Sequence, residues 1–393
     1  MTWHVSHTTL KVFVRCIHLA VQISSTGLTR ILGAGPAGLT AAIALAQAGR
    51  HVMVYDRAPD VGTRHDDDYE AMENWTTREN LTTEFAAWGL QTNFQCVPIH
   101  SLTCFGPGFA ATTQIEDSGP LFYIVRRGAG ENSLDHGLLT QALEAGVQVE
   151  FGCSQRPEQV DIVATGFPRA RAYVVGYTFE TSAQNACYMC LDTTLTPTLY
   201  AYLIICEGQG TIGFGTSSPM LHLDQTLDRI VAGFRSRVRF NVEAPRRFAA
   251  AGAFGLPETA QRDGRLYVGE AAELQDPLFG FGLRMSMATG YLAARSILDQ
   301  DDYDSLWQAR LMPQLQAASV NRMLFKMIGN PGYRLLVPYL RFFKGAGRNL
   351  FHRYYHPLWY TRLLWPLARH AVLAELDRQH ARIRKTKSLR SSS

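Results

Sequence analysis

Three glycines near the start of the chain constrain its fold more than any other feature. Gly33, Gly35 and Gly38 stand in G-x-G-x-x-G spacing, followed by a small-residue stretch and then by the apolar run HVMVYD, which ends at Asp56. This pattern predicts a strand, a helix and a second strand that together bind a dinucleotide. The glycines would permit a tight turn, close approach of a pyrophosphate to backbone N–H groups, and close packing of helix on sheet. Asp56 stands where an acid accepts hydrogen bonds from a ribose.

Two later segments each read as a strand followed by a turn. DIVATG (161–166) is an apolar strand that ends in Ala-Thr-Gly, and LYVGEAAELQDP (266–277) comes about a hundred residues later. Gly280 and Gly282 then precede an apolar stretch that predicts a helix.

These segments together resemble the flavoproteins of the p-hydroxybenzoate hydroxylase superfamily, and within it the geranylgeranyl reductase-like branch. The resemblance covers roughly residues 30–300 and rests mainly on GAGPAGL (33–39) with Asp56 and on GEAAELQDPLFGFGLRMSMATGYLAA (269–294). Residues 123–152, and VGTR followed by ENW, are also similar to the family. In PTLYAYLIICEGQGTIG (197–213) the chain departs from the reductases' Y-x-W-x-F-P pattern: Tyr replaces Trp, and Phe-Pro is absent.

The resemblance implies FAD as the cofactor. The residues that it implies for FAD binding are Gly33, Gly35, Pro36, Ala37, Gly38, Asp56, Arg57, Arg64, Arg127, Thr165, Gly166, Gly269, Glu270, Pro277, Gly280, Gly282 and Leu283. The helix that begins near Gly280 to Leu283 would point its N-terminus at the isoalloxazine and stabilise the negative charge of a reduced flavin. Tyr200 and Tyr202 alternate along a predicted strand, so both would face either a substrate cavity or the core. No catalytic residue is identified.

The predicted fold is α/β, with a Rossmann-like FAD-binding domain, an inserted β-sheet substrate domain and a helical C-terminal region. We expect the FAD domain to comprise residues 27–62, 120–168 and 260–300, and the substrate domain residues 63–119 and 169–259. These insertions are rich in Thr, Tyr, Phe and Val, which favours a sheet. Residues 1–26 are interpreted as an N-terminal extension, and residues 301–393 as the helical region.

The expected function is an FAD-dependent oxidoreductase that reduces carbon–carbon double bonds of a hydrophobic, isoprenoid or lipid-like substrate. The chain has one dinucleotide fingerprint, so NAD(P)H, or another electron donor, would bind transiently. An FAD-dependent monooxygenase acting on an aromatic or terpenoid substrate is one alternative, and a non-redox flavin-binding protein or cyclase is another. The W-x-W-x-I-P signature of flavin-dependent halogenases is absent from the sequence.

Charge and cysteine content bear on partners and location. Residues 322–393 hold 15 Lys or Arg and two acids, interleaved with Trp, Tyr and Phe. This composition suits either a helical cap or a peripheral contact with a membrane surface, and it matches no nucleic-acid-binding module. Seven scattered cysteines favour a cytoplasmic location, and the lone C-x-x-C of Cys187 and Cys190 is interpreted as packed thiols. HDDD (65–68) is interpreted as a solvated charge run, and no metal site is predicted.

Overall fold

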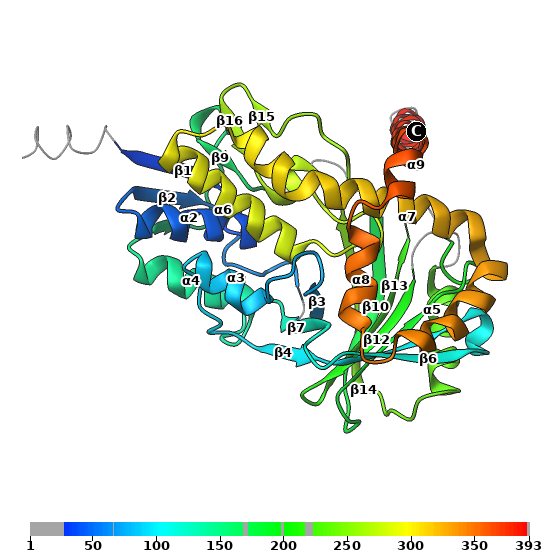
Figure 1. The fold of residues 1–393 in the computed structure, drawn as a ribbon. Helices are drawn as coiled ribbons and strands as arrows, with labels where there is room; N and C mark the ends of the chain where they lie inside the picture. The colour runs from blue at the N-terminus through cyan, green and yellow to red at the C-terminus, as the bar shows by residue number, and fades with distance from the viewer. Residues whose placement is uncertain (1–26, 66, 168–171, 198–199, 217–222, 391–393) are drawn as a thin grey trace, which may run out of the picture.

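The chain folds around two large sheets that are joined by a smaller one and flanked by helices (Figure 1). The computed structural model describes residues 27–65, 67–167, 172–197, 200–216 and 223–390, with side chains described as far as residue 374. The predicted extension, residues 1–26, lies outside the described residues. The predicted class is confirmed: the fold is mixed α/β, with a Rossmann-like domain, an inserted sheet and a helical C-terminal region.

A six-stranded sheet carries the glycine motif. Its order is β15 (Gln261–Arg262), β16 (Arg265–Tyr267), β9 (Ile162–Val163), β1 (Leu28–Leu32), β2 (His51–Tyr55) and β8 (Gln148–Glu150). The central strand β1 pairs in parallel with both β2 and β9, and β9 pairs in parallel with β16. The three segments expected to form the FAD domain, 27–62, 120–168 and 260–300, therefore each contribute strands to this sheet.

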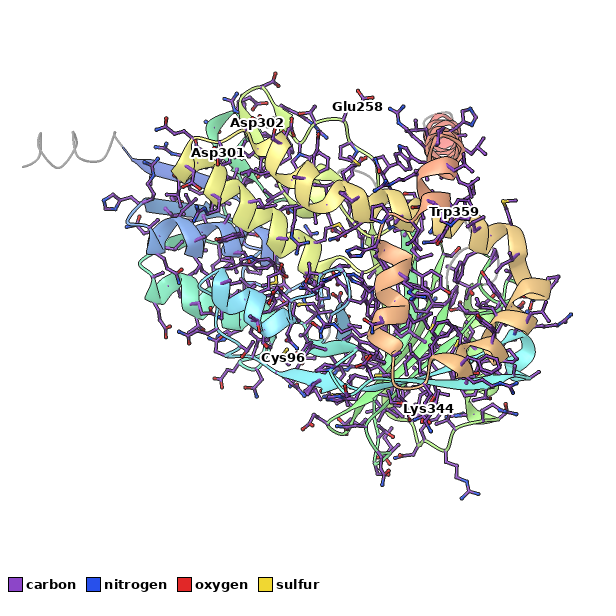
Figure 2. All side chains as sticks on the ribbon, viewed as in Figure 1. Cys96, Glu258, Asp301, Asp302, Lys344 and Trp359 are labelled. Atoms are coloured by element: carbon purple, nitrogen blue, oxygen red, sulfur yellow. The ribbon has the colours of Figure 1, made fainter. Side chains whose placement is uncertain are left out.

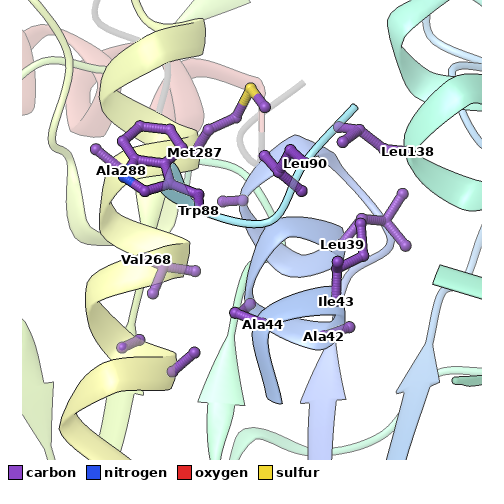
Figure 3. Close-up of a cluster of buried hydrophobic side chains, with 14 of the residues drawn as sticks. Leu39, Ala42, Ile43, Ala44, Trp88, Leu90, Leu138, Val268, Met287 and Ala288 are labelled. Atoms are coloured by element: carbon purple, nitrogen blue, oxygen red, sulfur yellow. The ribbon is translucent and has the colours of Figure 1, made fainter. Parts of the chain in front are cut away.

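Three helices pack beside this sheet. They are α2 (Pro36–Gln47), α4 (Leu134–Glu144) and α6 (Leu283–Asp299), and α2 lies between the other two (Figure 3). Their apolar side chains, with Trp88 and Leu90 from the segment after α3 (Leu81–Ala87), form one buried cluster. The backbones of α2 and α6 come very close, because a Cβ atom on Gly290 would lie 2.1 Å from the carbonyl oxygen of Ala37. Small residues at this contact hold the two helices together.

The remaining strands form two further sheets. The three-stranded sheet has the order β3 (Tyr69–Glu73), β7 (Phe122–Arg126), β4 (Cys96–Ile99). The seven-stranded sheet has the order β14 (Glu243–Gly252), β10 (Ala172–Glu180), β13 (Gln209–Thr216), β12 (Ala201–Cys206), β11 (Ala186–Cys190), β5 (Ser101–Phe105), β6 (Thr112–Glu116). Helix α5 (Leu223–Arg235), which the sequence analysis did not predict, packs against the larger sheet through Leu227, Ile230 and Phe234. Cys187 and Cys190 are both buried, in different hydrophobic clusters, as expected of packed thiols.

The C-terminal region is helical, as predicted. It comprises α7 (Tyr303–Tyr339), the short 3₁₀ helix η4 (Leu340–Phe343), α8 (Gly347–Tyr355) and α9 (Trp359–Arg390), and α9 packs on α7. Further 3₁₀ turns lie at η1 (Pro107–Phe109), η2 (Pro157–Gln159) and η3 (Gly269–Ala272). Some tail aromatics, including Phe351 and Tyr355, are buried against the body, whereas others remain exposed. Among the described helices, none combines the length and the apolar character needed to cross a membrane.

Candidate cofactor and substrate site

One large cavity lies between the six-stranded and seven-stranded sheets. Its volume is about 1050 Å³, and its wall takes residues from the glycine motif, the segment before α6, strands β10 to β14, and helices α7 and α8. A pocket for a drug-sized ligand typically measures about 300–1,000 Å³. The cavity therefore has room for a ligand as large as a dinucleotide.

The glycine motif forms one end of this cavity. Gly33 has φ +111°, and a Cβ atom there would lie 2.3 Å from the carbonyl oxygen of Ala164 on the neighbouring strand. At Gly38 a Cβ atom would lie 2.0 Å from the carbonyl oxygen of Gly33, so the helix sits directly on the turn. Gly35 differs, because a Cβ atom there would meet nothing within 4 Å. The space beside Gly35 thus belongs to the cavity, directly before the first turn of α2.

The first turn of α2 has its N-terminal backbone N–H groups available. Gly35 is the residue before the helix, it provides no capping side chain, and Pro36 occupies the first helical position. Uncapped N–H groups and the helix dipole together make an anion site. Gly35, Pro36 and Ala37 all line the cavity, so this anion site opens into it.

Asp56 lies beside the anion site at the end of β2. Its Oδ2 accepts a hydrogen bond from the backbone N–H of Ala34 (2.7 Å), and its Oδ1 accepts one from the N–H of Ala58 (2.8 Å). These bonds fix the carboxylate, and each oxygen keeps a lone pair for a further donor. Arg57 lines the same stretch of wall. The predicted role of Asp56 as acceptor for ribose hydroxyls fits this geometry.

Another part of the wall is the segment that precedes α6. Asp276 organises it: the carboxylate accepts hydrogen bonds from the N–H groups of Leu278 (2.8 Å) and Phe279 (3.0 Å) and from the hydroxyl of Tyr355 (2.6 Å). Burial raises the pKa of Asp276. Helix α6 begins at Leu283 after Gly282, again without a capping side chain. A second uncapped helix N-terminus therefore borders the cavity.

A network of charged groups also lines the cavity. The Arg127 guanidinium is buried and donates to Asp135 through Nε (2.9 Å) and Nη2 (3.0 Å), and to Glu70 through Nη1 (2.7 Å). His65 Nδ1 lies 3.1 Å from Oδ1 of Asp68. All five residues line the cavity.

His65, Asp68 and Glu70 place their ligand atoms within 4.8 Å of one another. The predicted charge run HDDD (65–68) also contains Asp66 and Asp67. Asp66 lies outside the described residues. Glu70 is already paired with Arg127, whose positive charge opposes that of a cation. The group therefore does not alter the expectation that no metal is bound.

Glu270 has a perturbed titration. Burial, with the charge of Glu70, raises its pKa to about 7, although Arg127 and Arg64 act in the opposite direction. Arg64 lies close to Gly166, where a Cβ atom would be 3.1 Å from Nη1. A carboxylic acid with this pKa exchanges its proton near neutral pH.

The substrate side of the cavity is aromatic. Tyr200 and Tyr202 both line the cavity. The sequence left open whether their side chains face a substrate cavity or the core, and this position favours the cavity. The hydroxyl of Tyr200 donates to the carbonyl of Phe279 (2.9 Å). Burial, with the charge of Asp68, raises the pKa of Tyr202 well above its usual range.

The predicted cofactor residues that line the cavity come from distant parts of the chain. They are Gly33, Gly35, Pro36, Ala37, Asp56, Arg57, Arg64, Arg127, Thr165, Gly166, Glu270, Pro277, Gly280, Gly282 and Leu283. Gly38 and Gly269 lie behind the wall. Gly38 packs on the glycine turn, and the N–H of Gly269 donates to Thr289 Oγ1 (2.8 Å). The guanidinium of Arg127 is directed at two carboxylates, and its predicted contact with FAD phosphates stays a prediction.

Several wall residues were not identified from the sequence. Trp75 lies in the wall, stacked on Phe351 with ring centroids 4.5 Å apart and edge-on to Phe281 at 5.1 Å. Trp75 precedes a helix and Phe351 belongs to the tail, so no local spacing connects them. Asp276 did carry a signal, because Asp before Pro often opens a side-chain-bonded turn.

Known structures show where this architecture occurs. A geranylgeranyl bacteriochlorophyll reductase-like protein from Thermoplasma acidophilum superposes with a TM-score of 0.62 at 15% identity, over 80% of this chain and 92% of that one. The flavin-dependent brominase Bmp2 gives 0.57 at 15% identity, over 89% and 99%. A 2-methyl-3-hydroxypyridine-5-carboxylic acid oxygenase gives 0.51 at 12% identity, over 82% and 95%. The chain has the fold of these proteins.

Comparison by sequence finds similarity over a much shorter part of the chain than comparison by structure does. The family model of the NAD(P)-binding Rossmann-like domain matches residues 31–73, which contain the glycine motif and Asp56. No curated protein matches the sequence. The resemblance to the geranylgeranyl reductase-like and related flavoproteins is thus borne out through the fold.

Proposed function

We propose that the protein is an FAD-dependent oxidoreductase that reduces carbon–carbon double bonds of a hydrophobic, isoprenoid or lipid-like substrate. The observation that carries the proposal is one continuous cavity, which joins the glycine motif of the six-stranded sheet to an aromatic wall on the seven-stranded sheet. A dinucleotide with a redox-active ring needs such a continuous space, because its phosphates and its ring must reach opposite ends.

The residues present fit FAD. The open space beside Gly35 and the uncapped start of α2 suit the pyrophosphate, and the fixed carboxylate of Asp56 suits a ribose. The uncapped start of α6 suits the negatively charged edge of a reduced flavin. When bound and reduced, the flavin would supply a hydride, with NAD(P)H or another donor as the source of electrons.

The reduction of a double bond also needs a proton. His65 is the one histidine in the cavity wall among the described residues, and Asp68 accepts from its Nδ1. A carboxylate in this position orients the ring and stabilises the imidazolium, which leaves Nε2 free to donate. We therefore name His65 as the proton donor, oriented by Asp68, with Glu270 as the second candidate because its pKa lies near 7.

The substrate wall favours an apolar molecule. It includes Leu102, Phe122, Val174, Met189, Ile204, Phe248, Phe279, Phe281 and Phe351. Aromatic and aliphatic side chains recognise a ligand by burying its apolar surface, and they offer few polar contacts to fix polar substituents. An isoprenoid chain matches this lining.

A monooxygenase is the second candidate, because the fold is shared with an oxygenase as well as with a reductase-like protein. The purified protein should show flavin absorption that bleaches anaerobically with dithionite. Recovery of the oxidised spectrum with a polyprenyl compound and without oxygen supports the reductase. Recovery only with oxygen, accelerated by an aromatic or terpenoid compound, replaces it with the monooxygenase. Absence of flavin after reconstitution contradicts both.

The proton donor is tested separately. In His65→Gln, anaerobic reoxidation by the polyprenyl compound should slow at least about a hundredfold, in the range of general acid catalysis. Dithionite reduction and flavin binding should be unchanged. If His65→Gln slows dithionite reduction and reoxidation equally, or leaves the rate of reoxidation unchanged, the assignment of His65 is contradicted.

A further inference from the structure

The C-terminal half of α7 and the adjoining η4 expose large apolar side chains. Leu335, Tyr339 and Phe342 are 77%, 55% and 68% exposed, although the same segment buries Val337 and Leu340. Spacings of four and three residues place the three exposed side chains on adjacent turns, and the rings of Tyr339 and Phe342 have centroids 5.6 Å apart. Isolated exposed apolar residues are ordinary, but a contiguous group of this size marks a contact surface.

Three cations flank this group. Arg334, Arg341 and Lys344 are exposed, and none makes an ion pair with the described residues. The Arg341 guanidinium lies over the Phe342 ring, 4.9 Å from its centroid. We call Arg334, Leu335, Tyr339, Arg341, Phe342 and Lys344 the amphipathic face.

The surrounding sequence excludes negative charge. Residues 305–374 contain no Asp or Glu but ten Lys or Arg, namely Arg310, Arg322, Lys326, Arg334, Arg341, Lys344, Arg348, Arg353, Arg362 and Arg369. An occupant complementary to the amphipathic face is therefore apolar at its centre and negative at its edge. A bilayer with anionic headgroups has both properties.

A second copy of the chain fits less well. In a symmetric dimer the same surface of each copy meets its counterpart, so Arg334, Arg341 and Lys344 would face their own equivalents. No acid from residues 305–374 could pair with them. Like charges brought together in this way oppose association.

We infer that the amphipathic face binds the surface of an anionic membrane, with Leu335, Tyr339 and Phe342 in the interface and the three cations at the headgroups. Helix α7, which carries part of the face, also contributes Arg322 to the cavity wall, and the next helix after the face, α8, contributes Phe351. A lipid-like substrate would suit such a position. Only this connection between membrane binding and a lipid-like substrate rests on the proposed function. Membrane binding itself can be measured without any enzymatic turnover.

A second exposed apolar stripe lies on α9. It consists of Trp359, Leu363 and Leu367, and Figure 2 shows Trp359 well separated from Lys344. Arg362 is the cation within this stripe, and the nearby Arg369 is paired with Glu258 at 3.1 Å. The stripe therefore has fewer unpaired cations than the amphipathic face, and we assign the membrane contact to the latter.

The experiment is cosedimentation of the full chain with vesicles of phosphatidylcholine, with or without about one third phosphatidylglycerol. We expect binding to the anionic vesicles that falls steeply at about 0.5 M salt, because salt screens exposed charges. R334Q/R341Q/K344Q should weaken binding about a hundredfold, since each cation near the surface contributes about fivefold. L335S/F342S should weaken it at least about tenfold.

Leu143→Ser on α4 is the matched control, because Leu143 is also an exposed leucine, at 53%, and it should bind as the wild type does. Thermal melting confirms that each variant is folded, and the charge variant tests the inference even if L335S/F342S proves unstable. Equal binding to both vesicle types overturns the inference, and so does wild-type binding by the charge variant. If only W359S/L363S loses vesicle binding, the inference is overturned and the membrane contact belongs to α9. A wild-type dimer that L335S/F342S dissociates identifies a second copy as the occupant.

Discussion

Gly35→Ala should separate cofactor binding from folding. Gly35 has φ −80° and ψ 177°, a conformation that alanine adopts without strain. The added methyl group meets no protein atom within 4 Å, so it projects into the cavity beside the start of α2. The apoprotein should keep its stability, or gain up to about 1 kcal/mol because alanine restricts the unfolded chain.

The same methyl group should weaken FAD binding strongly. It would occupy the space in which a phosphate approaches the N–H groups of α2. Loss of one charge-assisted hydrogen bond, at about 1.5–3 kcal/mol, with part of the helix dipole contribution, at about 0.3–1 kcal/mol, gives about 3 kcal/mol. The Kd for FAD should therefore rise about a hundredfold.

The assay is titration of the apoprotein with FAD, followed by flavin fluorescence, together with thermal melting of the apoprotein. Gly290→Ala is the contrasting variant: its Cβ atom would lie 2.1 Å from the Ala37 carbonyl oxygen, so melting should reveal a loss of about 1–3 kcal/mol from overpacking. FAD affinity of Gly35→Ala equal to that of the wild type would refute the location of the pyrophosphate. A melting temperature well below that of the wild type would refute the open space.

Three further predictions concern buried polar groups. Burial raises the pKa of Glu73 to about 7, so this group should lower the free energy of unfolding by about 3 kcal/mol as the pH rises from about 4.5 to 7, and urea titrations of Glu73→Gln should show a fall smaller by that amount than the fall in wild type. Arg127→Met leaves Asp135 unpaired, and chemical denaturation should show a loss of about 3–5 kcal/mol. Tyr355→Phe removes a donor to Asp276, and melting should show a loss of about 1–2 kcal/mol. A free energy of unfolding that changes equally with pH in wild type and in Glu73→Gln would contradict the first assignment. A loss of stability less than half of that predicted for Arg127→Met or Tyr355→Phe would contradict the second or the third.

The sequence predicted the parts of the fold that local spacing controls. The glycine motif, the strand that ends before Asp56 and the segment before α6 each carry a constraint within a few residues, namely close backbone approach or an uncapped helix start. These constraints operate through the backbone, so they are visible as glycines at fixed intervals. The structure places the same glycines at the turn, at the helix contact and in the cavity wall.

The rest of the site depends on contacts between distant residues. Trp75 stacks on Phe351, 276 positions later, and Arg127, directly after β7, pairs with Glu70 of β3. Neither pair leaves a periodic signal, because side-chain contacts across a fold impose no spacing on the sequence. Helix α5 was missed for a different reason: it lies within a stretch whose flanking composition favours strands, and its apolar face comprises only a few residues.

The close contact of α2 with α6 has a consequence for how the protein is made. Gly290 packs on Ala37, and β16 pairs with β9, so the glycine motif gains its full surroundings only from residues some 250 positions further along. A ribosome releases the chain from its N-terminus at about 5–20 residues per second. The nucleotide-binding end therefore waits on the order of tens of seconds for α6. We expect cofactor loading to follow synthesis of α6, and chains that end before it to depend on chaperones.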